Sequence, residues 1–138
     1  MSDDEFLAAF EDCSLRNGDF HHADHVRMAF LYLSRFPAIE ALQRFADSLQ
    51  RFAAFHGKPE RYHETITWAF VFLIRERMSR HAGSVRDWEQ FADQNADLLN
   101  WKDNILRRYY RKETLASDLA RKTFVFPDRL PTGDSELA

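Results

Sequence analysis

PAIEALQRFADSLQRFAAF, residues 37–55, carries the clearest helix signal of the sequence. The apolar side chains that repeat the helical period in it are Leu42, Phe45, Leu49, Phe52 and Ala53. This spacing places them on one face of an amphipathic α-helix. Because proline fits the first turn of a helix, we predict a core helix that runs from Pro37 to Phe55.

Further helices are predicted from the glycines, prolines and capping residues that interrupt the apolar segments. Ser2 can cap a first helix, Pro37 ends the second, Gly57 separates the third from the fourth, and Ser84 can cap a fifth. Besides residues 37–55, the predicted helices cover residues 3–12, 21–36, 59–81, 84–99, 102–111 and 113–122.

The fold class follows from the absence of any strand pattern. No segment alternates apolar and polar residues with β-branched enrichment, and no hairpin dipeptide joins two such runs. We therefore predict an all-α fold with a four-helix-bundle core and additional short helices at the termini. The 138 residues fit one helical domain, 1–138, in which about 130–138 form a frayed tail.

Charge and composition argue against several classes of function. The chain has 19 basic and 22 acidic residues, and no basic block stands apart from neighbouring acids, so nucleic-acid binding is not expected. The single cysteine, Cys13, excludes an internal disulfide and a cysteine-built zinc site. With no apolar run of about 18 residues and an acidic start, the sequence predicts a cytoplasmic protein without membrane contact.

The stretch FHHADHVRMAF, residues 20–30, concentrates half of the six histidines within five positions. On a helix, His22 and His25 share one face, and this face continues into the apolar residues of the segment. His21 lies about 100° away from His22 and is expected outside, as a cap or a supporting group. We therefore predict that His22 and His25 point inward together.

The stretch RYHETITWAF, residues 61–70, places His63 beside Glu64 at the start of another apolar helix. A carboxylate among apolar neighbours is costly to bury unless it is paired or coordinates a cation. If the two helices lie side by side, these stretches can form a shared N,N,N,O site near one end of the bundle. The predicted metal ligands are His22, His25, His63 and Glu64.

Such a site suits a divalent transition metal: iron, zinc, manganese or nickel. The protein is then a metal-binding protein and a candidate metal-dependent enzyme, either a hydrolase or a non-haem iron oxygenase. Glu64, if it is not a ligand, is the natural catalytic general base. Whether His21, His56 or Glu60 joins the site stays open at this stage.

Three motifs carry a resemblance to known proteins: F-x-H-x-x-H-V-R-x-A at residues 20–29, Y-H-E-T-I-T at 62–67 and F-V-x-P-D at 124–128. In these motifs the chain resembles a group of small bacterial all-helical proteins, mostly uncharacterised. The resemblance implies that His22, His25 and His63 matter, without naming a reaction. In architecture alone, the predicted bundle looks like the metal-binding bundles of the DinB type, whose sites use three histidines.

Two other functions compete with the metal site. In the first, His63 and Glu64 perform metal-free proton transfer on a small-molecule substrate in an aromatic pocket. In the second, the protein is a non-catalytic helical interaction module with structural histidines, and exposed apolar surface forms a homodimer or partner interface.

Overall fold

Every regular element of the described chain is helical. The computed structural model describes residues 1–81, 83 and 87–129, and within them only α-helices and short 3-10 helices occur. The predicted all-α fold is therefore confirmed. In the same part of the chain, no helix has the length and apolar character that crossing a membrane requires. The predicted capping residue Ser84 and the predicted tail at 130–138 lie outside the described residues.

Eight α-helices and three 3-10 helices make up the described part of the chain. The α-helices are α1 (Asp3–Glu11), α2 (His22–Arg35), α3 (Ala38–Phe55), α4 (Glu64–Arg80), α5 (Trp88–Gln94), α6 (Ala96–Leu99), α7 (Lys112–Ala116) and α8 (Asp118–Lys122). The 3-10 helices are η1 (Asn17–Asp19), η2 (Pro59–Arg61) and η3 (Ile105–Arg108).

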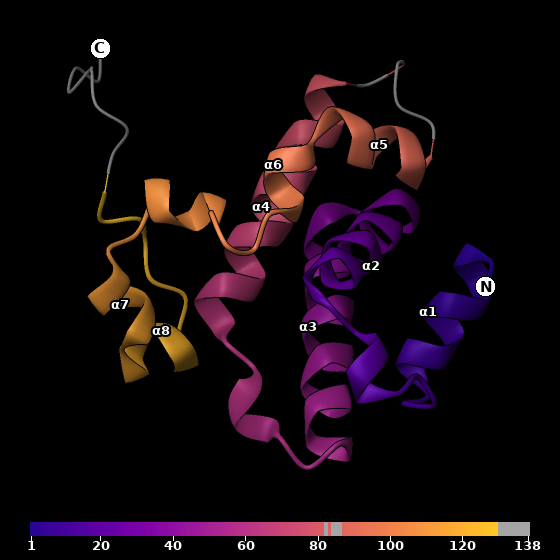
Figure 1. The fold of residues 1–138 in the computed structure, drawn as a ribbon, viewed down its shortest axis with the longest axis horizontal. Coiled ribbons are helices and arrows are strands. Elements are labelled where there is room, and N and C mark those ends of the chain that lie inside the picture. Colours follow the sequence, from indigo (N-terminus) through magenta and orange to yellow (C-terminus); the bar gives the residue numbers. More distant parts are fainter. Residues whose placement is uncertain (82, 84–86, 130–138) are drawn as a thin grey trace.

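The three longest helices, α2, α3 and α4, pack against one another and form the centre of the molecule (Figure 1). Helix α1 packs on α2 and α3, and the short helices α5 and α6 cover α2. Helix α8 packs on α4, so the pair α7–α8 lies on the other side of α4 from α2 and α3. Helix α4 thus lies between the α2–α3 pair and the α7–α8 pair.

The predicted face of residues 37–55 forms the core. Phe45, Leu49 and Phe52 are buried, and Leu42 packs against the same cluster. Helix α3 starts one residue after Pro37, which is its N-cap, and its end is followed by Gly57 with a φ of 76°. Because this left-handed conformation favours glycine, Gly57 ends the helix as its sequence position predicts.

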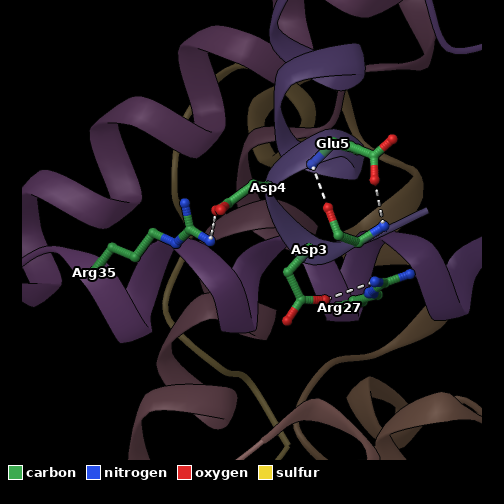
Figure 2. A network of polar contacts seen from close by, with 6 residues as sticks. Asp3, Asp4, Glu5, Arg27 and Arg35 are labelled. Carbon is green, nitrogen blue, oxygen red and sulfur yellow. Dashed lines mark hydrogen bonds and ion pairs between the residues drawn. The ribbon is translucent and has the colours of Figure 1, made fainter.

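Two ion pairs join α1 to α2 (Figure 2). Arg27 donates to the carboxylate of Asp3 at 2.6 Å, and its guanidinium carbon lies 4.4 Å from the ring centroid of Phe6. Arg35 donates to Asp4 at 2.5 Å from a more exposed position. The Arg27 side chain is 22% exposed, against 38% for Arg35, so water screens the Arg27 pair less.

We expect Arg27→Ala to lower the free energy of unfolding by about 2 kcal/mol, because it removes a partly buried ion pair and a cation–π contact. Arg35→Ala is the matched control and should lose only about 0.5 kcal/mol, as exposed ion pairs do. Urea unfolding monitored by circular dichroism measures both values. Equal losses in the two variants would contradict this account of the α1–α2 junction.

The fourth helix begins later than predicted. Pro59 opens the 3-10 helix η2 instead of an α-helix, and Tyr62 is extended, with φ −66° and ψ 134°. The α-helix starts only at Glu64, after the His63 ring accepts the backbone N–H of Ile66. A side chain that caps the backbone in this way fixes a new helix start. His63 is therefore an N-cap and not a member of the helix.

The predicted helix over residues 84–99 is wrong as one helix, because it is divided at Asn95. Asp87 caps α5 by accepting the Gln90 N–H at 2.9 Å. The Asn95 side chain then donates to the carbonyl of Phe91 at 2.9 Å and competes with the backbone ladder at that point. Arg77 of α4 donates to the same Asn95 side chain at 2.9 Å, which anchors the break against α4.

Candidate functional site

The two histidine stretches meet at one cavity. Its volume is about 550 Å³, and His22, His25 and His63 all line it. Helix α2 contributes the first two from its opening turns, and His63 comes from the start of α4, which packs on α2. The structure thus brings together the three histidines that the sequence singled out.

Aromatic rings form much of the remaining wall. The aromatic side chains that line the cavity, apart from Tyr62 and the histidines, are Phe20, Phe45, Phe52, Phe70 and Trp101. Trp101 is 54% exposed, and its ring centroid lies 4.9 Å from that of His22. The cavity therefore has an apolar interior, with a partly exposed indole at its edge.

His22 uses one ring nitrogen for structure. Its Nε2 lies 2.9 Å from the carbonyl oxygen of Leu98, and since a carbonyl only accepts, Nε2 carries the proton. Nδ1 of the neutral ring is then left as an acceptor. Burial lowers the pKa of His22 below its ordinary value, and the Leu98 carbonyl partly opposes the shift.

His25 lies deeper in the wall and has no such partner. Its ring packs 4.3 Å from the ring of Phe20, and no group in the described part of the chain forms a hydrogen bond with it. Burial, and then repulsion from the charged form of His22, lower the pKa of His25 to about 3. At neutral pH, His25 therefore offers the cavity an uncharged imidazole with a free donor and a free acceptor.

Both ring nitrogens of His63 are engaged with the backbone. Nδ1 accepts the N–H of Ile66 at 3.1 Å, and Nε2 donates to the carbonyl of Leu115 at 2.7 Å. Together the two bonds require the neutral ring with its proton on Nε2. Burial and the nearby Arg121 lower the pKa of His63, although the Leu115 carbonyl favours the charged form. His63 can bind a metal only if one of these bonds breaks.

Glu64 is directed to a neighbour and not to the cavity. The hydroxyl of Tyr62 donates to its carboxylate at 2.5 Å, and Tyr62 itself lines the cavity, whereas Glu64 does not. Burial raises the pKa of the Tyr62 phenol, and the bond to Glu64 adds to the shift. The predicted catalytic group thus reaches the cavity only through the Tyr62 hydroxyl.

The four predicted metal ligands do not form one coordination sphere. Within residues 1–81, 83 and 87–129, no three His, Cys, Asp or Glu side chains lie close enough to share an ion. A structural transition-metal site normally needs four protein ligands, and a catalytic one needs three. Of the predicted set, His22 and His25 are the two histidines whose rings keep a nitrogen without a protein partner.

The three residues left open in the sequence have structural partners. His21 is the exposed N-cap residue of α2, and its backbone N–H donates to Asp24 at 2.9 Å. His56 donates from Nε2 to the carbonyl of Leu15 at 3.1 Å. Glu60 is exposed and accepts through its carbonyl from Arg121 at 2.6 Å. None of them lines the cavity described above.

Sequence reasoning missed two cations on the cavity wall. Lys58 is the N-cap residue of the 3-10 helix η2 and Arg61 is its last residue, and both line the cavity together with the histidines. Their positions depend on the short η2 turn. The sequence had instead predicted a continuous helix from Pro59. The signal available in the sequence was the pair of basic residues on either side of Pro59 and Glu60.

The Y-H-E-T-I-T motif also holds the C-terminal segment, through side chains that bind backbone atoms. Besides the bond from His63 to Leu115, the Thr65 hydroxyl donates to the carbonyl of Thr123 at 2.8 Å. The same hydroxyl accepts the N–H of Val125 at 3.1 Å. We call this set of contacts the C-terminal clamp.

The F-V-x-P-D motif completes the clamp from the other side. The Tyr110 hydroxyl donates to the carbonyl of Val125 at 2.6 Å. The carboxylate of Asp128 accepts the hydroxyl of Thr114 and the N–H of Arg111, the latter at 2.9 Å, and these two bonds lower the pKa of Asp128. The second and third motifs of the resemblance thus contribute to one structural network.

Comparison of the chain with family models, with curated proteins and with solved structures finds no match.

Proposed function

We propose that the protein binds a small organic molecule in the histidine-lined cavity, where the molecule exchanges hydrogen bonds with His25. A volume of about 550 Å³ is within the range of small-molecule sites, and such sites combine apolar walls with a few polar groups. Aromatic rings supply the walls, and the imidazoles of His22 and His25 supply the polar groups.

The observation that carries the proposal is the unpaired ring of His25. No described residue bonds to this ring, which is partly buried and lines a cavity large enough for a ligand. Each hydrogen bond between the ring and a complementary ligand group would contribute about 0.5–1.5 kcal/mol.

The environment of His25 favours ligand binding over acid–base catalysis as its role. A general base is most effective when its pKa lies near the working pH. The pKa of His25 is lowered to about 3, and Glu64 is held by Tyr62 outside the cavity. The proposed role of His25 is therefore to position a ligand by hydrogen bonds.

Ligand-observed NMR with a library of small aromatic compounds tests the proposal. We expect the wild type to bind members of the library, and His25→Phe to lose most of that binding because it fills the cavity and removes both hydrogen-bonding groups. His21→Phe is the matched control, since His21 is exposed and does not line the cavity. A wild type that binds nothing, or a His25→Phe variant that binds equally well, would refute it.

A metal centre is the second candidate, and one observation favours it. The N–H of His22 is donated to a backbone carbonyl, which is the usual orientation of a metal-bound histidine, and its free Nδ1 belongs to the same cavity as His25. Nδ1 of His22 and a ring nitrogen of His25 would hold a divalent transition metal. His63 would be a third ligand if the bond from the Ile66 N–H to its Nδ1 breaks. The metal would supply Lewis-acid chemistry for a hydrolytic or oxygen-activating enzyme.

Elemental analysis by plasma mass spectrometry separates the two candidates. The protein is incubated with iron, zinc, manganese or nickel and then dialysed, beside a His22→Ala/His63→Ala double variant. Near-stoichiometric metal that vanishes in the double variant would establish the metal centre. Equal metal content in both proteins would refute the metal centre and leave the organic ligand site as the proposed function of the cavity.

A further inference from the structure

We infer that the ligand of the cavity is an aromatic carboxylic acid bound as its monoanion, with the carboxylate at Lys58 and Arg61 and the ring among the aromatic walls. The inference builds on the proposed small-molecule function and specifies the chemical class of the ligand. It is carried by the distribution of charge around the cavity.

The charged side chains on the described part of the cavity wall are cations. Lys58 and Arg61 both line it, whereas none of the described lining residues is Asp or Glu. Neither cation forms an ion pair within the part of the chain that the structure describes. A cavity with this charge pattern attracts an anion and repels a cation.

The position of the cations places the anionic end of the ligand. Arg61 is exposed and Lys58 is partly buried, and both belong to the short segment that connects α3 to α4. A carboxylate bound there keeps contact with water, so little desolvation opposes its binding. The planar guanidinium of Arg61 also matches the two oxygens of a carboxylate.

The interior fits the uncharged remainder of such a ligand. Phe20, Phe52 and Phe70 line it, and aromatic rings prefer offset or edge-to-face contacts with a planar ring. The imidazoles of His22 and His25 add hydrogen-bonding groups to the same wall. A ligand with one negative charge at one end and an aromatic body therefore fits the whole cavity.

Matched pairs of probes test the charge requirement. Benzoic, 2-naphthoic and indole-3-carboxylic acids are each compared with the corresponding amide by titration calorimetry. We expect the best acid to bind about tenfold more tightly than its amide, as for a hydrogen-bonded charged group. Lys58→Gln/Arg61→Gln should abolish this preference, so that each acid binds no more tightly than its amide. Arg107→Gln/Arg108→Gln, at exposed arginines outside the cavity, is the matched control.

The outcomes distinguish the ligand class from the site itself. Amides that bind as tightly as the acids, or a preference that survives the Lys58 and Arg61 substitutions, would overturn the inference while the binding cavity stands. The same holds if the broad library yields ligands that depend on His25 but no acid binds. If no compound of any class binds, the proposed function fails together with the inference.

Discussion

Lowering the pH from 6.5 to 5 is expected to destabilise the folded protein by about 1.5 kcal/mol through His25 alone, and by more once His22 and His63 are included. His22, His25 and His63 all have a pKa below the ordinary value of 6.5, and that of His25 is about 3. The folded chain therefore binds fewer protons than the unfolded chain in this range. Stability that is present above pH 6.5 is lost as the pH falls, at a rate that approaches about 1.4 kcal/mol per pH unit for His25, and the lowered pKa values of His22 and His63 add losses in the same direction.

Urea unfolding at a series of pH values measures this dependence. The carboxyl groups of Asp97 and Asp128 also have lowered pKa values, but their ordinary value of 3.8 places their contribution at lower pH. His25→Gln should reduce the slope between pH 6.5 and 5 by the share of one proton. His21→Gln, at an exposed position, is the matched control and should keep the wild-type slope. A stability that stays constant down to pH 5 would contradict the burial of neutral imidazoles.

Replacing His63 by alanine is expected to lower the free energy of unfolding by about 2–3 kcal/mol. The variant loses the cap on the Ile66 N–H and the donor to the Leu115 carbonyl. Because the second bond belongs to the C-terminal clamp, the loss should be concentrated in α7, α8 and the segment that follows. Amide hydrogen exchange should accelerate at Thr123 and Val125 more than in the core of α3.

His63→Asn separates the two functions of this side chain. Asparagine is a good N-cap but is too short to reach Leu115, so the variant should recover about 1 kcal/mol of stability while the clamp stays open. Fast exchange at Thr123 with a restored helix start is the expected pattern. If His63→Ala unfolds at the same urea concentration as the wild type, the clamp does not stabilise the fold.

Most of the helical framework could be predicted because its signals are local. Ser2, Pro37 and Gly57 lie where they bound helices in the structure, and the period of residues 37–55 identified the buried face of α3. The meeting of the two histidine stretches was also predictable, since both begin apolar helices. That expectation needed only the assumption that these helices pack side by side.

The roles of the histidines could not be predicted, because their partners are backbone groups distant in sequence. His22 bonds to a carbonyl 76 residues away, and His63 bonds to one 52 residues away. Every residue has a carbonyl, so no sequence pattern marks the one that will accept a given proton. Glu64 was predicted to be free for catalysis because the sequence does not show that the Tyr62 side chain, two residues away, turns its hydroxyl to the Glu64 carboxylate.

The C-terminal clamp has a consequence for how the sequence can change during evolution. Thr65 and Tyr110 form hydrogen bonds with the backbone of Thr123 and Val125, and not with their side chains. Thr65 and Tyr110 are thereby constrained in residue type, whereas Thr123 and Val125 are constrained only in backbone conformation. Substitutions should accumulate at residues such as Thr123 long before they occur at Thr65. Distant descendants of this chain would then conserve the side chains of the clamp while the sequence of the segment bound by them changes.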